Sequence, residues 1–93
     1  MKITILKKTD KELRIEVEGA DHGFCNLLQK RLLDERNVDM GGYDIPHPLA
    51  SNPIIYVRTK GALTPEEALL KAAEKAREAN TAFSEALEKA LKA

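Results

Sequence analysis

Two histidines and one cysteine are the side chains of this sequence with the widest chemical range, and each stands near a carboxylate. His22 lies between Asp21 and Cys25, and His47 follows Asp44 by three residues. Imidazole, thiol and carboxylate groups can bind metals or act as general acids and bases. A metal site needs three or four ligands at characteristic spacings, and the sequence shows no such set. We therefore expect both histidines to serve as structural hydrogen-bonding residues.

The glycines and aspartates do not predict a phosphate or magnesium site either. Gly41 and Gly42 precede an extended segment, whereas a phosphate-binding loop places its glycines before a helix. The sequence also lacks the cluster of aspartates that holds magnesium in a polymerase. Cys25 is expected to be a small buried hydrophobic residue, because a reactive thiol needs an exposed, cationic setting. We expect no catalytic, cofactor-binding or metal-binding residue in this chain.

The composition is typical of one small domain without a general affinity for nucleic acids or membranes. All 93 residues are expected to form a single domain (1–93). Lysine plus arginine and aspartate plus glutamate both total 15, so no net charge attracts nucleic acid. No apolar run approaches the ~20 residues of a membrane span, and the first residues are typical of a strand rather than a signal peptide. We expect a cytoplasmic protein, and its single cysteine excludes an internal disulfide.

Alternating hydrophobic residues predict two pairs of antiparallel strands. Ile3 and Ile5 alternate with polar neighbours, and Leu13, Ile15 and Val17 do so after a turn at residues 9–11. The second pair is expected at residues 38–44 and 54–59. A helix is expected after each pair. This order predicts a two-layer α+β sandwich, in which a four-stranded antiparallel sheet carries two helices on one face.

The first helix is expected to run from Asp21, a good N-cap residue, to about Glu35. Five of its apolar residues span roughly 160° of the helix, and Leu33 lies roughly 80° further round. A helix that rests on one sheet needs an apolar arc of only about 100°, so this helix is expected to contact two surfaces. The five residues are Phe24, Cys25, Leu27, Leu28 and Leu32.

The second helix has the clearest local signals. Thr64 is placed as its N-cap, Pro65 as its first residue and Glu67 as the acidic member of a capping box. One apolar stripe, about 120° wide, then continues from Leu69 to Leu91. The pattern predicts a single helix from Thr64 to Lys92.

This second helix is too long for the predicted sheet. Roughly 29 residues make a helix of about 43 Å, whereas a strand of six residues spans only about 20 Å. Part of the stripe must therefore meet another chain, bend back or stay exposed. We expect a partner surface on the two helices, formed by Phe24, Leu27, Leu28, Leu32, Phe83, Leu87 and Leu91.

The connection between the third and fourth strands is rich in proline. Pro46, Pro48 and Pro53 each remove a backbone donor, so this segment cannot be a central strand. On physical grounds alone a rigid loop is favoured over a docking ridge for a neighbouring subunit. The residues of the docking alternative are Pro46, His47, Pro48 and Leu49.

Several segments, in a fixed order, carry a resemblance to one protein family. They are Asp21-His22, Asn26-Leu27-Leu28, Gly42-Tyr43-Asp44-Ile45-Pro46-His47-Pro48-Leu49, Thr59-Lys60-Gly61 and Thr64-Pro65-Glu66-Glu67-Ala68-Leu69. With this combination the chain resembles the small alpha-like subunits of DNA-directed RNA polymerases in their archaeal form, subunit L. That family also includes eukaryotic counterparts and the amino-terminal domain of the bacterial alpha subunit. The likeness covers nearly the whole chain and departs from the family pattern at Gly23-Phe24-Cys25.

The resemblance implies a role in assembly. The implied partner is the larger alpha-like subunit of the polymerase, designated D in archaea, and the resulting heterodimer is implied to be the platform for the two large catalytic subunits. The chain would then belong to a nucleotidyltransferase that transcribes DNA, while it supplies no catalytic group itself. The alternative is a free-standing homodimeric interaction domain of the same fold. A small enzyme that uses His22 or His47 would need a site that the sequence does not show.

Overall fold

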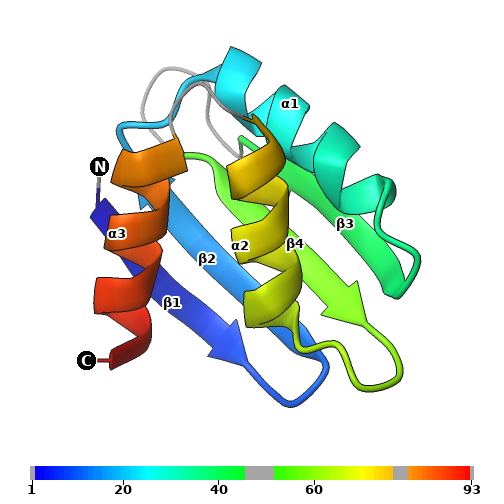
Figure 1. Cartoon of the computed structure of the whole chain (residues 1–93). Helices are drawn as coiled ribbons and strands as arrows, with labels where there is room; N and C mark the ends of the chain where they lie inside the picture. Colours follow the sequence, from blue (N-terminus) through cyan, green and yellow to red (C-terminus); the bar gives the residue numbers. More distant parts are fainter. Residues whose placement is uncertain (1, 46–51, 77–79, 93) are drawn as a thin grey trace.

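A four-stranded antiparallel sheet and three helices account for the residues that the computed structural model describes, which are 2–45, 52–76 and 80–92. The elements are β1 (Lys2–Lys8), β2 (Glu12–Glu18), α1 (His22–Leu33), β3 (Val38–Asp44), β4 (Ile54–Thr59), α2 (Pro65–Ala76) and α3 (Asn80–Lys92). The strand order is β1-β2-β4-β3, and the helices lie together on one face of the sheet (Figure 1). The α+β class and the one-sided antiparallel sheet predicted from the sequence are confirmed.

The alternation in the strands places one set of side chains beneath the helices. Ile15 of β2 lies between Ile5 of β1 and Ile55 of β4 in the strand register. In β4, Ile55 and Val57 are buried, whereas Ile54 and Tyr56 are half-buried on the opposite face. Each fully buried Val, Leu or Ile stabilises the fold by roughly 1.5–3 kcal/mol. The buried strand residues are Ile3, Leu13, Ile15, Val17, Ile55, Val57 and Thr59.

The helix α1 begins where its N-cap predicts and contacts two surfaces. The Asp21 carboxylate accepts a hydrogen bond of 2.7 Å from the backbone N–H of Phe24, which satisfies a donor of the first turn. The helix then packs against both β3 and α2, so the wide apolar arc read from the sequence is explained. Both contacted elements belong to this chain.

The sequence prediction of one helix from Thr64 to Lys92 is wrong, because α2 ends at Ala76 and α3 begins at Asn80. The two helices lie side by side and run in opposite directions, and α3 covers β1 (Figure 1). Phe83 and Leu87 of α3 are completely buried. The apolar stripe from Leu69 to Leu91 was expected to meet another chain, bend back or stay exposed. In the structure the chain bends back. A straight helix would leave this half of the stripe and the apolar face of β1 in water, which is unfavourable.

The start of α2 follows the local sequence signals. Gly61 adopts a left-handed φ of 70° in the turn before the helix, a conformation that only glycine adopts without strain. The Thr64 hydroxyl then accepts from the Glu67 backbone N–H at 3.2 Å, and the Glu67 carboxylate accepts from the Thr64 backbone N–H at 3.1 Å. These reciprocal bonds are the predicted capping box.

Candidate interaction surfaces

The helix residues predicted to face a partner lie mostly inside this chain's own core. Leu27 and Leu91 are half-buried and remain accessible at the surface of the helix layer. The other five side chains have exposed fractions between 0% and 8%; they are Phe24, Leu28, Leu32, Phe83 and Leu87. In the free chain these five residues form a hydrophobic core, and any contact with a partner requires them to become accessible.

An aromatic contact joins the α1 residues of this predicted surface to its α3 residues. The rings of Phe24 on α1 and Phe83 on α3 lie 5.3 Å apart between centroids, at an interplanar angle of 55°. Tilted aromatic pairs at this distance contribute roughly 0.5–1.5 kcal/mol beyond the burial of their area. Residues that lie 59 positions apart in the sequence therefore stabilise one another in the helix layer.

The candidate chemical residues form structural contacts. The Tyr43 hydroxyl of β3 lies 2.9 Å from Nδ1 and 3.1 Å from Nε2 of His22, which connects the first turn of α1 to the edge strand β3. Within residues 2–45, 52–76 and 80–92, no three histidine, cysteine or acidic side chains come together as metal ligands. Sequence reasoning paired His22 with acidic neighbours and missed Tyr43, because β3 brings the two together only in the folded chain. His47 and the proposed docking residues 46–49 lie outside the described residues.

Cys25 of α1 is buried, as the sequence predicts, with an exposed fraction of 1%. Burial raises the pKa of its thiol to about 11, and the nearby Asp21 carboxylate adds to the rise. A thiol that keeps its proton at neutral pH is a poor nucleophile and a poor metal ligand.

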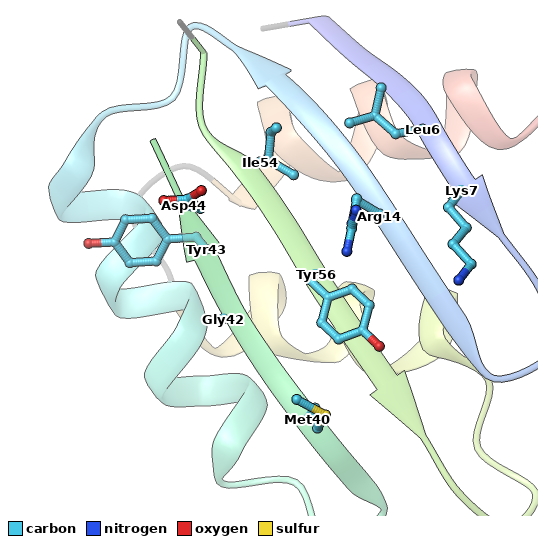
Figure 2. Close-up of a pocket in the computed structure, with 9 residues that line it drawn as sticks. All are labelled: Leu6, Lys7, Arg14, Met40, Gly42, Tyr43, Asp44, Ile54 and Tyr56. Atoms are coloured by element: carbon cyan, nitrogen blue, oxygen red, sulfur yellow. The ribbon is translucent and has the colours of Figure 1, made fainter. Parts of the chain in front are cut away.

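The face of the sheet opposite the helices carries an open depression that sequence reasoning missed (Figure 2). Leu6 and Met40 stand at its two ends with exposed fractions of 46% and 47%. The Arg14 guanidinium lies 5.4 Å from the centre of the Tyr56 ring, within the range of a cation–π contact. The lining residues are Leu6, Lys7, Arg14, Met40, Gly42, Tyr43, Asp44, Ile54 and Tyr56.

Charged residues of both signs, Lys7, Arg14 and Asp44, line this depression. Lys7 pairs with Glu12 at 2.8 Å, and the Arg58 guanidinium pairs with Asp39 at 2.9 Å. Exposed pairs of this kind contribute little stability, roughly 0–1 kcal/mol each. The sequence did carry a signal for this depression. The apolar run of β4 is unbroken, and because successive strand residues point to opposite faces, Ile54 and Tyr56 place apolar groups on the face opposite the helices. None of the helices in the described part of the chain is both long and apolar enough to cross a membrane.

The fold defines a small two-layer α+β protein, and its described candidate residues form packing and hydrogen-bonding contacts. The chain belongs to the family of the RNA polymerase Rpb3/Rpb11 dimerisation domain, which matches residues 12–86. The match includes all four helix positions of α1 in the predicted partner surface and ends within α3.

Archaeal relatives agree with the family assignment. DNA-directed RNA polymerase subunit Rpo11 of Pyrococcus furiosus is 44% identical over 94 residues, which cover 99% of each chain. Its counterpart in Saccharolobus solfataricus is 42% identical over 77 residues, covering 83% of this chain and 84% of the relative. A solved structure of DNA-directed RNA polymerase subunit L from Thermoplasma acidophilum superposes with a TM-score of 0.71 at 26% identity, covering 97% of this chain and 88% of that one. The resemblance read from the sequence motifs is confirmed.

Proposed function

We propose that this chain is an assembly subunit of an archaeal, cytoplasmic DNA-directed RNA polymerase. It pairs with the larger alpha-like subunit of that enzyme, and the pair is the platform on which the two large catalytic subunits assemble. The chain contributes no catalytic group to nucleotide transfer. The single domain that carries this function spans residues 1–93.

The observation that carries the proposal is the match to a dimerisation domain over residues 12–86, which include α1, α2 and most of the sheet. Near-complete coverage of relatives that are named as polymerase subunits supports the same role. The structure adds a physical basis for pairing. All three described helices lie in one layer, so an apolar partner could meet them together (Figure 1).

Size-exclusion chromatography of the chain alone and after mixing with the purified larger alpha-like subunit tests the proposal. We expect a new peak that contains both chains in equal amounts, because a shared dimerisation domain pairs one copy of each. A homodimer that leaves the larger subunit unbound would support the alternative of a free-standing homodimeric domain. Co-purification of the tagged chain from native cells should recover the large polymerase subunits as well.

The half-buried leucines allow a test of the helix layer as the pairing surface. Leu27→Glu and Leu91→Glu place a charge where a partner would exclude water, so each should weaken pairing, by roughly 2 kcal/mol or more. Met40→Glu is the matched control, because Met40 is exposed on the opposite face of the sheet. Normal affinity of both leucine variants, with intact circular dichroism, would show that the interface lies elsewhere.

A further inference from the structure

The bare face of the sheet carries a cation that forms no ion pair within the described residues. Arg14 lies between Lys7 and Tyr56 in the depression, with its guanidinium 5.4 Å from the centre of the Tyr56 ring (Figure 2). Its neighbour Lys7 pairs with Glu12 at 2.8 Å, whereas none of the ion pairs in this part of the chain includes Arg14. A guanidinium that stacks on a ring keeps its N–H donors free at its edge, so Arg14 can receive a carboxylate from another molecule.

The strand register arranges the charges of this face in two rows. Arg14 of β2 lies opposite Lys7 of β1, and these two residues form a basic row. Glu16 of β2 and Asp44 of β3 both lie opposite Ile54 of β4, one on each side of it, and form an acidic row. Residues two positions apart in a strand point to the same face, so the two rows are separated by roughly 6.7 Å along the strands.

The width of the bare face fits an α-helix. The edge strands β1 and β3 are three strand spacings apart, or about 14 Å. Leu6 and Met40 project from these strands with exposed fractions of 46% and 47%, and Ile54 and Tyr56 between them are half-buried. A helix with its side chains is about 10–12 Å wide, so one helix that lies over β2 and β4 can contact both exposed residues. Small molecules favour concave sites that bury most of their surface, whereas this depression is open.

The repeat of a helix also matches the spacing of the two rows. Helix residues four positions apart lie on one face and are separated by about 6 Å along the axis, close to the separation of the rows. A helix that runs along the strands can therefore place an acidic side chain over Arg14 and, four positions away, a basic side chain between Glu16 and Asp44. A nucleic acid strand fits less well, because its phosphates would meet the acidic row.

We propose that the bare face of the sheet docks an amphipathic helix of a neighbouring subunit of the assembled enzyme, other than the pairing partner. This helix carries an acidic and a basic residue four positions apart within a face that is otherwise apolar. The acidic residue pairs with Arg14, and the apolar residues contact Leu6, Met40 and Tyr56. The inference rests on the assembly function proposed above, and it uses the face that pairing through the helix layer leaves free.

Reversal of the Arg14 charge tests the docking in the paired chain. Arg14 is exposed, so Arg14→Glu leaves the core intact. The chain is first paired with the purified larger alpha-like subunit, and the affinity of this pair for the purified large catalytic subunits is then measured. We expect a Kd about 30-fold weaker or more, because the new carboxylate repels the acidic residue of the docked helix. Arg36→Glu is the matched control, since it makes the same change at an exposed position outside the depression, between α1 and β3.

Pairing is measured separately, by size-exclusion chromatography, so that the two proposals can fail independently. Normal pairing and unchanged affinity of Arg14→Glu for the large subunits would overturn the docking and leave the assembly function intact. Loss of pairing in Arg14→Glu, with unchanged circular dichroism, would overturn the docking as well, because the bare face would then belong to the pairing surface. If the parent pair itself recruits no large subunit, the assembly function fails, and the docking fails with it.

A photo-crosslink identifies the occupant directly. Tyr56 is replaced by the photoreactive analogue benzoylphenylalanine, which keeps an aromatic ring on the bare face, and the polymerase is reconstituted from purified subunits. Mass spectrometry of the crosslinked peptide should identify a segment of a large catalytic subunit that has an acidic and a basic residue four positions apart. A crosslink to the larger alpha-like subunit, or none in fully assembled enzyme, would refute the docking.

Single-stranded RNA is the probe for the other class of occupant. Fluorescence anisotropy with a labelled RNA should give the same result for the parent pair and for the pair that contains Arg14→Glu. Binding of RNA by the parent pair that is lost in Arg14→Glu would assign the bare face to nucleic acid and overturn the docking of a helix.

Discussion

At the scale of single residues, Thr64 and Glu67 form the strongest local determinant of a helix start. Each side chain accepts a hydrogen bond from the other residue's backbone N–H. The bond from the Thr64 backbone, followed by the bond from its hydroxyl, lowers the pKa of the Glu67 carboxyl below its usual 4.5. A carboxylate with a lowered pKa stabilises the fold above its unfolded pKa, and this contribution is lost as the pH falls through the folded value.

Replacing Thr64 with alanine should therefore destabilise the chain in a pH-dependent way. At pH 7 we expect a loss of about 1 kcal/mol, which lowers the Tm by roughly 4–8 °C. The loss should shrink as the pH falls below 4.5, because the unfolded carboxylate takes up a proton there and the folded carboxylate does so at lower pH. Thermal unfolding followed by circular dichroism measures both effects, and Thr64→Ser is the control that keeps the hydroxyl. An equal loss at pH 3 and pH 7 would show that the Thr64 hydroxyl contributes nothing to the lowered pKa of Glu67, because the bond from the backbone N–H remains in the alanine variant.

Cys25 should be protected from thiol reagents in the native chain. Its folded pKa of about 11 exceeds the reference value of 9.0, so at pH 8 the native thiolate is roughly 100-fold rarer than in the unfolded chain. Burial adds steric protection. We expect slow reaction with a disulfide reagent in buffer and rapid reaction in guanidinium chloride. Fast native reaction would contradict the burial of this side chain.

The same thiol gives the free energy of unfolding a dependence on alkaline pH. Below pH 9.0 Cys25 keeps its proton in both states, so it contributes no change with pH. Between pH 9.0 and about 11 the unfolded thiol loses its proton while the folded thiol retains it, so stability falls across this window. Urea titrations measure the free energy of unfolding of the parent chain and of Cys25→Ala at pH 8 and pH 10.5. The difference between the two chains should be smaller at pH 10.5 than at pH 8. A constant difference would contradict the raised pKa.

At the scale of secondary-structure elements, local patterns predict where most helices and strands begin and end. The predicted strands at residues 38–44 and 54–59 coincide with β3 and β4, and Asp21 caps α1 as expected. Alternation and capping act within a few residues, so a sequence records them directly. The division between α2 and α3 leaves no comparable signal. Its cause is the docking of Phe83 and Leu87 against elements that are distant in sequence.

The candidate surface shows the same limit of sequence reasoning. An apolar stripe predicts that a helix face avoids water, and Phe24, Leu28 and Leu32 do avoid it. The stripe does not show which chain provides the cover, because hydrophobic burial is not directional. The role of these residues toward a partner stays a prediction. The contact of His22 with Tyr43 was likewise beyond sequence reasoning, since the strand register decides it.

Truncation of Phe83 measures how firmly α3 is docked in the free chain. Phe83→Ala should lower the free energy of unfolding by about 3–5 kcal/mol, because it removes a fully buried ring and leaves a cavity. Leu91→Ala, at a half-buried position of the same helix, should cost much less. Guanidinium titration of both variants provides the comparison. Equal small losses would show that α3 is not packed on the core of the free chain.

At the scale of the whole molecule, the sheet separates two surfaces of different character. The helix layer holds the buried apolar residues and the proposed pairing surface, while the bare face of the sheet presents Leu6 and Met40 beside the charged Lys7, Arg14 and Asp44 (Figure 2). A platform subunit must contact more than one neighbour, and two separate faces allow this without competition.

Replacing both histidines with glutamine tests this non-catalytic role in the assembled enzyme. Glutamine keeps hydrogen-bonding capacity but cannot titrate, so His22→Gln with His47→Gln removes any acid–base function. Polymerase reconstituted with this variant should incorporate nucleotides at a near-normal rate per assembled complex. A lower yield of complex is the expected defect, because His22 connects α1 to Tyr43 on β3. Loss of a general acid or base typically slows a reaction by about 10²–10⁴-fold. A drop of that size in fully assembled enzyme, with subunit ratios confirmed by gel electrophoresis, would show that the chain takes part in catalysis.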